Sequence, residues 1–123
     1  MKNILVIDDD SGILEALKLV LEFNGYRVYT LQKVENLMSN IETIAPDVIL
    51  LDVLLSGSDG RVICKNLKKS DFKNIPIILI SAQPDLKSTS KTSGAEDFLA
   101  KPFDINDLLD KVSKWTKNPS SPT

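Results

Sequence analysis

Three stretches of mostly apolar residues stand out along the chain, and each ends abruptly at a polar side chain. The runs and the side chains that end them are residues 4–7 with Asp8, residues 48–51 with Asp52, and residues 75–80 with Ser81. Unbroken apolar runs are typical of the central strands of a parallel sheet, because helices cover both of its faces. In open sheets of this kind the chemistry lies outside the carboxyl ends of the strands. The pattern therefore predicts that these strand ends converge on one acidic site.

Between these runs, apolar residues recur at spacings of three and four, as they do on the buried face of an amphipathic helix. The clearest case predicts a helix that is capped by Asp10 or Ser11 and closed by Asn24 and Gly25. A weaker pattern predicts a second helix, marked by Val34, Leu37, Met38 and Ile41. A third helix is predicted with Val62, Ile63 and Leu67 as its buried face. The last is predicted to be capped by Asp104 and to have on its apolar side Ile105, Leu108, Leu109, Val112 and Trp115.

Two further segments, residues 26–30 and 97–100, are typical of strands that flank the centre of a sheet. Because strands and helices alternate, the chain is predicted to have an α/β fold, a three-layer sandwich of five βα units around a five-stranded parallel sheet. Residues 82–93 contain a proline and five Ser or Thr, so the fourth helix is expected to be short or frayed. We expect one domain over residues 1–117, followed by a disordered tail over residues 118–123.

Composition narrows the classes of function. The 123 residues include 15 basic and 17 acidic side chains and no basic run, which argues against direct binding to nucleic acid. A single cysteine, Cys64, excludes an internal disulfide, and the absence of histidine excludes a histidine-based catalytic or metal site. With no signal peptide and no apolar run of transmembrane length, we expect a cytoplasmic protein that has no membrane partner.

Five short motifs occur along the chain, most of them at the ends of predicted strands. They are Asp8-Asp9-Asp10, Leu51-Asp52 with the later Asp59-Gly60, Ile80-Ser81-Ala82, Gly94-Ala95 and Lys101-Pro102-Phe103. Each motif alone is common by chance, but all of them in this order resemble the receiver domains of two-component response regulators over residues 2–116. The resemblance implies a flavodoxin-like (βα)5 topology with strand order 2-1-3-4-5, and we interpret the chain as a stand-alone receiver.

The acidic residues account for the expected cofactor. Asp8, Asp9 and Asp52, if brought close, would repel one another and raise one another's pKa unless a cation neutralised them. Mg²⁺ suits such a site, since it is bound by a few carboxylates together with water and phosphoryl oxygens. The resemblance implies that these three carboxylates and the backbone carbonyl of Leu54 hold Mg²⁺. It also implies that Asp52 is the nucleophile that becomes an acyl phosphate.

The resemblance also assigns roles to residues around Asp52. Lys101 would supply a point charge to one phosphoryl oxygen and Ser81 a hydroxyl donor to another. Ser81 and Phe98 would form a switch in which the ring moves between exposed and buried positions, and the Lys101-Pro102 peptide bond would be cis. The expected phosphoryl donor is a sensor histidine kinase or a histidine phosphotransfer protein, and the output is a downstream protein target. Self-phosphorylation and self-dephosphorylation would be weak, so the chain is expected to be a signalling module and not a metabolic enzyme.

Two other classes of protein remain open. A small aspartyl-phosphate phosphatase of the haloacid dehalogenase type also places a nucleophilic aspartate at a strand tip, but it needs a second aspartate two residues later, where this chain has Leu54. A receiver-like module that is never phosphorylated would be expected to lack the acidic pair, the acceptor or the lysine, and all are present. Among single residues, Asp10 is expected to cap a helix and not to bind metal, while Cys64 and Trp115 are expected to be packing residues.

The chain departs from the pattern of that family in two places. Ser56 and Gly57 occupy a loop where proline is common, so we expect this loop to be somewhat more mobile. The interval between Ser81 and Gly94 is shorter than usual, and we therefore expect a monomer or a weak, phosphorylation-dependent dimer. The resemblance also implies that the side chains of Leu54 and Gln83 influence hydrolysis of the acyl phosphate. Gln83 could orient a water molecule if its amide turned inward, but Leu54 has no polar atom to hold one, and we expect Leu54 to dominate and the phosphorylated state to be long-lived.

Overall fold

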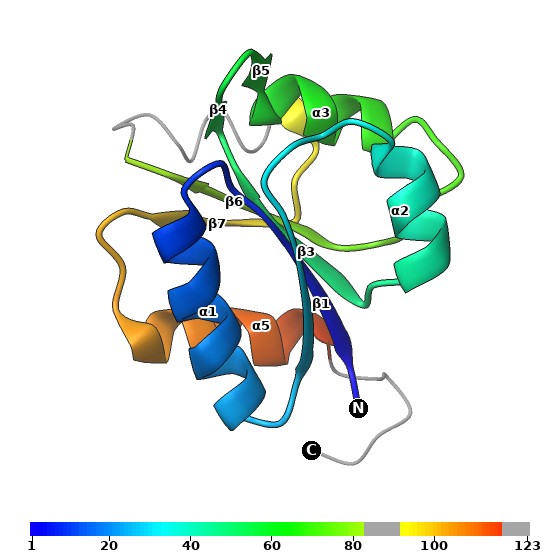
Figure 1. The fold of residues 1–123 in the computed structure, drawn as a ribbon. Coiled ribbons are helices and arrows are strands. Elements are labelled where there is room, and N and C mark those ends of the chain that lie inside the picture. The colour runs from blue at the N-terminus through cyan, green and yellow to red at the C-terminus, as the bar shows by residue number, and fades with distance from the viewer. Residues whose placement is uncertain (83–91, 117–123) are drawn as a thin grey trace.

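Five parallel strands form the central sheet of the molecule (Figure 1). The structure, a computed structural model, describes residues 1–82 and 92–116. The strands of the sheet are β1 (Asn3–Ile7), β2 (Arg27–Leu31), β3 (Val48–Asp52), β6 (Ile77–Ser81) and β7 (Asp97–Ala100). They lie in the order β2-β1-β3-β6-β7, and every neighbouring pair is parallel. Since β4 and β5 form a separate hairpin, β6 and β7 are the fourth and fifth strands of the main sheet. The order is therefore the predicted 2-1-3-4-5, and the flavodoxin-like topology is confirmed.

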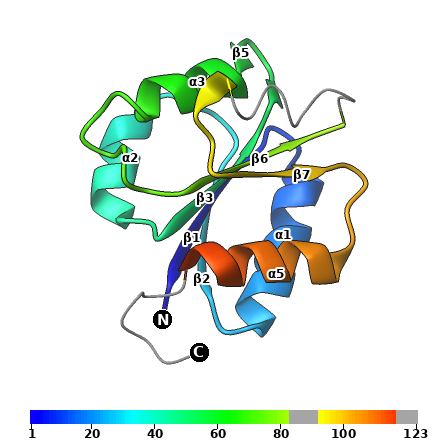
Figure 2. The same cartoon turned by 180° about the vertical axis from the view of Figure 1, so that it is seen from behind.

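Helices cover both faces of the sheet, as two views of the fold show (Figure 1, Figure 2). The described helices form two pairs, with α1 (Ser11–Phe23) and α5 (Ile105–Thr116) on one face and α2 (Leu37–Ile44) and α3 (Gly60–Leu67) on the other. Side chains alternate between these layers along a strand. In β1, Ile4 and Val6 pack with α1 and α5, while Leu5 and Ile7 pack with α2 and α3. The predicted three-layer sandwich is confirmed, and it explains why the central strands are apolar on both faces.

Both ends of α1 are closed as the sequence predicts. At its start, Oδ1 of Asp10 accepts hydrogen bonds from the N–H groups of Gly12 and Ile13, at 2.9 and 3.3 Å. At its end, Gly25 has a φ of 92°, which glycine adopts without strain, and its N–H donates to the carbonyl of Glu22. Asp10 is therefore a capping residue, as expected.

The second helix, α2, begins later than predicted. The apolar pattern places Val34 in this helix, but the helix starts at Leu37. Asn36 has a φ of 59°, in the left-handed region that Asn tolerates better than most residues, and the Leu37 N–H closes a turn onto the carbonyl of Val34. The chain therefore turns once more before the helix starts. Met38, also expected on the apolar side, is exposed.

The buried face of α3 differs from the prediction at one position. Leu67 is buried and Ile63 is partly buried, but Val62 is 55% exposed, whereas Cys64 is fully buried. The helix starts at Gly60, and its buried residues Gly60, Cys64 and Leu67 follow at spacings of four and three. Val62 lies on the opposite side of the helix, so the prediction for Val62 is wrong and that for Cys64 is confirmed.

The turn-rich segment after β3 forms a short hairpin. Its strands, β4 (Leu54–Leu55) and β5 (Ser58–Asp59), pair antiparallel, with Leu54 opposite Asp59. Gly57 supplies the φ of 74° at the turn between them. Because the hairpin follows directly after Asp52 and Val53, its residues border the carboxyl end of β3.

Two predicted elements cannot be compared with the structure. Most of the helix predicted over residues 82–93, and the whole of the tail predicted over residues 118–123, lie outside the described residues. The last described helix, α5, ends at Thr116. Its Leu108 and Val112 are buried as predicted, but Ile105, also expected on the apolar side, is 44% exposed, so the prediction for Ile105 is wrong. No helix in the described parts of the chain is long and apolar enough to cross a membrane.

Candidate functional site

Three carboxylates meet at the carboxyl ends of β1 and β3. Asp52 is the last residue of β3, and Asp8 and Asp9 follow directly after β1, the neighbouring strand. Because Ile7 pairs with Leu51 in the parallel register, Asp8 lies beside Asp52. One carboxylate oxygen from each of the three aspartates lies within 4.8 Å of the others. The structure thus brings together the three acids that the sequence pattern singles out, and we call them the acidic cluster.

Lys101 reaches the acidic cluster from the end of β7. Its Nζ lies 3.3 Å from Oδ2 of Asp52 and 3.4 Å from Oδ2 of Asp8. Its backbone N–H donates to the carbonyl of Ser81 at 2.8 Å, which fastens the end of β7 to the end of β6. The peptide bond between Lys101 and Pro102 is cis. One ammonium group thus faces two buried carboxylates at the same edge of the sheet.

Burial and neighbouring charges shift the pKa values of Asp52 and Lys101 in the acidic cluster. Burial raises the pKa of Asp52, and the charge of Asp8 raises it further, while Lys101 opposes both effects. Burial would lower the pKa of Lys101, but the carboxylates of Asp52 and Asp8 outweigh burial and raise that pKa. Lys101 supplies one positive charge to a cluster of three carboxylates, so one lysine does not balance the formal charge of the site. An additional cation would fit this charge imbalance.

Asp9 is the most exposed of the three acids, and it is held by a residue that sequence reasoning did not identify as its partner. The N–H and the hydroxyl of Ser56 both donate to Oδ2 of Asp9, at 3.0 and 2.7 Å. These hydrogen bonds, chiefly that of the hydroxyl, lower the pKa of Asp9. The two residues are 47 positions apart, so no local pattern reveals the contact. The sequence carries one signal for this contact, which is that position 56 is not proline, because proline has no N–H that could donate to Asp9.

Ser81 and Leu54 border the acidic cluster. Ser81 is buried at the end of β6, the strand that pairs with β3. The backbone N–H of Leu54 donates to Oδ1 of Asp52 at 3.3 Å, whereas the Leu54 side chain is 59% exposed. Each carboxylate oxygen of Asp52 therefore has a donor, Leu54 for Oδ1 and Lys101 for Oδ2.

Phe98, the aromatic residue of the expected switch, lies partly buried on β7. Nζ of Lys111, from α5, lies 5.6 Å from the centre of its ring. Lys111 also lies 3.3 Å from Oδ1 of Asp97, whose Oδ2 accepts the indole N–H of Trp115 at 2.8 Å. Trp115 packs against the core, as predicted, and is in addition anchored by this hydrogen bond. The ring of Phe98 thus lies beside a polar network that connects β7 to α5.

The fold and the acidic edge define the class of this protein as a doubly wound α/β domain with its candidate site at the carboxyl ends of the strands. The model of the response regulator receiver domain family matches residues 4–113. The chain therefore belongs to the response regulator receiver domain family. As a member of this family it is a signalling module and not a metabolic enzyme.

Individual relatives agree with this assignment. The chain is 34% identical over 112 residues to the response regulator MprA of Mycolicibacterium vanbaalenii. It is 33% identical over 117 residues to the DNA-binding dual master transcriptional regulator RpaA of Synechocystis sp.. These matches cover 89% and 91% of this chain but 48% of each relative, so the chain spans about half the length of these curated relatives. The solved structure of a two-component response regulator from Clostridium difficile matches with a TM-score of 0.87 and 27% identity, and covers 98% of this chain and 100% of the other.

Proposed function

We propose that this receiver domain accepts a phosphoryl group on Asp52 and thereby switches a surface that binds a downstream protein. The observation that carries the proposal is the environment of Asp52, which is buried at the tip of β3 with Lys101 3.3 Å from its Oδ2. Phosphoryl transfer depends mainly on positioning and on neutralising the charge of the transferred group. The N–H of Leu54 orients the carboxylate, and Lys101 supplies a positive charge.

The proposed cofactor is Mg²⁺, held by the carboxylates of Asp8, Asp9 and Asp52 and by the backbone carbonyl of Leu54. Three carboxylate oxygens within 4.8 Å of one another form a hard, all-oxygen donor set, which suits Mg²⁺ better than zinc or copper. Lys101 contributes one positive charge against three carboxylates, so a divalent cation fits the remaining negative charge of the site. When bound, Mg²⁺ would offset the negative charge of the phosphoryl oxygens.

Asp52 is the proposed nucleophile. One of its carboxylate oxygens attacks the phosphorus of a phosphohistidine, so that a P–O bond forms while the P–N bond breaks and its electron pair returns to the imidazole nitrogen. The ammonium of Lys101 would then contact an oxygen of the phosphoryl group, and the hydroxyl of Ser81 would donate to another. Phosphorylation therefore exchanges the contacts of Lys101 with Asp52 for contacts that exist only in the acyl phosphate state.

The proposed switch consists of Ser81 and Phe98. Ser81 lies opposite Ala100 in the register of β6 and β7, so a displacement of Ser81 would reach the strand that carries Phe98. The proposed phosphoryl donor is a sensor histidine kinase or a histidine phosphotransfer protein. The proposed receiver unit is residues 1–117, which contains the 4–113 range matched by the family.

Phosphorylation with a small donor tests this function. After incubation with acetyl phosphate and Mg²⁺, intact-mass spectrometry is expected to show a gain of one phosphoryl group. Asp52→Ala is expected to show no gain, whereas Asp71→Asn, which removes an exposed carboxylate elsewhere, is expected to gain mass as the wild type does. An equal gain in Asp52→Ala would show that another residue accepts the phosphoryl group. An unchanged wild-type mass would instead favour a receiver that acts without phosphorylation.

A further inference from the structure

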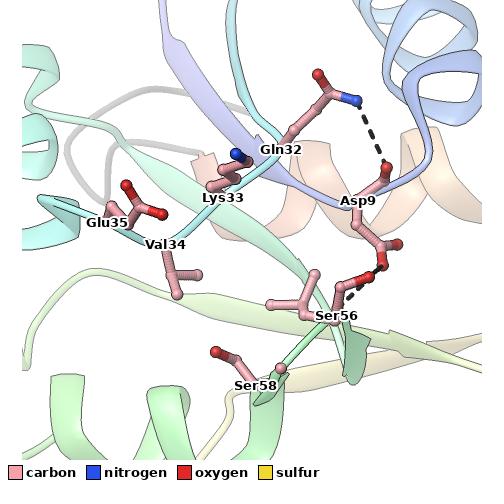
Figure 3. Close-up of a pocket in the computed structure, with 9 residues that line it drawn as sticks. Asp9, Gln32, Lys33, Val34, Glu35, Ser56 and Ser58 are labelled. Carbon is pink, nitrogen blue, oxygen red and sulfur yellow. Dashed lines mark hydrogen bonds between the residues drawn. The ribbon is translucent and has the colours of Figure 1, made fainter.

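Ser56 makes two hydrogen bonds to a single oxygen of Asp9 (Figure 3). Its backbone N–H donates to Oδ2 at 3.0 Å, and its hydroxyl donates to the same atom at 2.7 Å. A carboxylate oxygen offers two lone-pair sites, so these two donors saturate Oδ2. Oδ1 is then the oxygen of Asp9 that can accept a cation without breaking either hydrogen bond.

This contact depends on the residue at position 56 and not on the fold alone. Proline has neither an N–H nor a hydroxyl, so a proline here would remove both hydrogen bonds. The composition of the loop predicts greater mobility, but the structure shows Ser56 restrained by Asp9, which lies 47 positions away along the chain. The tip of the hairpin is thereby tied to the acidic cluster.

Ser56 and Asp9 both line a neighbouring pocket of about 500 Å³ (Figure 3). The hairpin lines one side of this pocket, and residues 32–35 line the other. Asp9 connects this pocket to the acidic cluster, because it lines the pocket and also contributes a carboxylate oxygen to the cluster. Asp9 is the most exposed of the three acids, so its side chain would retain several rotamers without Ser56. Ordering this side chain when the ion binds would cost conformational entropy, and the ion would therefore bind more weakly.

We propose that Ser56 is a positioning residue of the metal site, which holds Asp9 in a ligating orientation and thereby strengthens the binding of Mg²⁺. This inference rests on the proposed function, because it requires that Asp8, Asp9 and Asp52 bind the ion. Ligating carboxylates are commonly oriented by hydrogen bonds from outer residues, and loss of such a partner typically costs about 10–100-fold in metal affinity. By thermodynamic reciprocity, bound Mg²⁺ also stabilises the contact between Asp9 and Ser56.

Binding of Mg²⁺ to the full chain tests this role, with the dissociation constant measured by isothermal titration calorimetry. We expect the affinity to fall about 10-fold in Ser56→Ala, which keeps only the N–H, and further in Ser56→Pro, which keeps neither donor. Ser56→Thr keeps both donors and is expected to bind Mg²⁺ like the wild type. Ser58→Ala is the matched control, because Ser58 lies in the same hairpin and lines the same pocket, and it is also expected to bind like the wild type.

Hydrogen exchange at the Ser56 amide gives a second readout that does not depend on phosphorylation. Exchange of this amide, followed by NMR, is expected to slow when Mg²⁺ is added, because the ion fixes the carboxylate that accepts its hydrogen bond. A purely structural role would instead lower the unfolding temperature of Ser56→Ala equally with and without Mg²⁺. The inference requires that Mg²⁺ raise the unfolding temperature less in Ser56→Ala than in the wild type.

The outcomes separate this inference from the proposed function. If the wild type binds no Mg²⁺, the proposed function fails and the inference fails with it. If the wild type binds Mg²⁺ and Ser56→Ala binds it equally well or more tightly, Ser56 has no positioning role although the metal site stands. Equal weakening in Ser58→Ala would also overturn the inference, since the effect would then come from a general disturbance of the hairpin.

Discussion

Gly60 lies directly against the backbone of Asp52. A Cβ atom at position 60 would overlap the carbonyl oxygen of Asp52, and the Gly60 N–H donates to the carbonyl of Val53 at 2.8 Å. Asp59, the preceding residue, caps α3 by accepting a hydrogen bond from the Arg61 N–H. The Asp59-Gly60 pair therefore has two physical roles, because it starts α3 and lets the backbone of that helix approach the strand that carries Asp52.

Gly60→Ala is expected to lower the free energy of unfolding by about 1–3 kcal/mol, because the new methyl group forces two backbones apart. The same displacement moves Asp52, so phosphorylation by acetyl phosphate is expected to slow. Gly25→Ala is the control: its φ of 92° makes alanine unfavourable by about 1–2 kcal/mol, but a Cβ there meets no atom within 4 Å. Urea denaturation should show a loss in both variants, whereas only Gly60→Ala should slow phosphorylation. Wild-type kinetics in Gly60→Ala would contradict this explanation of the glycine.

Lys101→Ala is expected to destabilise the protein while leaving metal binding in place. Removing one partner of a fully buried ion pair costs about 3–5 kcal/mol, but Lys101 is 23% exposed, so we expect about 1–3 kcal/mol without Mg²⁺. Added Mg²⁺ should restore part of this loss, because it neutralises Asp8 and Asp52. Asp9→Ala removes a proposed metal ligand, so this variant should lose Mg²⁺ affinity, whereas Lys101→Ala should keep it. Urea denaturation and Mg²⁺ titration measure the two effects, and an equal loss of metal affinity in both variants would show that the roles are assigned wrongly.

Trp115→Phe is expected to lower stability at neutral pH more than in acid. Burial would raise the pKa of Asp97, but the Trp115 indole N–H, together with the Phe98 N–H and Lys111, outweighs it, so the folded pKa is lowered from 3.8. A lowered pKa stabilises the folded state above the pKa of the unfolded chain, and this contribution is lost as the pH falls through the folded value. A hydrogen bond to a charged group contributes about 1.5–3 kcal/mol, so urea denaturation at pH 7 should show a loss of this size, and the loss should shrink as the pH falls below 3.8. A loss independent of pH would mean that Trp115 stabilises through packing alone.

The strands and the caps of α1 could be predicted from the sequence because their signals are local. An apolar run that stops at Asp52 shows both the buried strand and its end, and Asp10 and Gly25 supply the hydrogen bond and the backbone conformation that close a helix. The acidic cluster follows from the same signals, since parallel strands end at the same edge of a sheet. Its members could therefore be named before any distance was known.

The contacts that the sequence could not reveal depend on distant residues or on the exact start of a helix. Ser56 lies 47 positions from Asp9, and its hydroxyl gives no periodic signal. Val62 was assigned to the wrong side of α3 because the phase of a short helix follows from its first residue, and Gly60 takes that place through its packing against Asp52. In α2 the left-handed conformation of Asn36 delays the helix, although the apolar spacing continues back to Val34.

Leu54→Asn is expected to shorten the lifetime of phosphorylated Asp52. Hydrolysis of the acyl phosphate needs a water molecule in line with the bond between Asp52 and phosphorus, and polar side chains near the phosphoryl group orient such a water. The Leu54 N–H is fixed to Oδ1 of Asp52 at 3.3 Å, and its apolar side chain is 59% exposed beside the site, so an amide placed there could hold the attacking water. A tenfold faster decay corresponds to about 1.4 kcal/mol in the barrier. The measurement is the loss of phosphorylated protein after the donor is removed, with Leu19→Asn as a control that changes another exposed leucine, on α1. Equal or slower decay in Leu54→Asn would show that another residue controls the access of water to this bond.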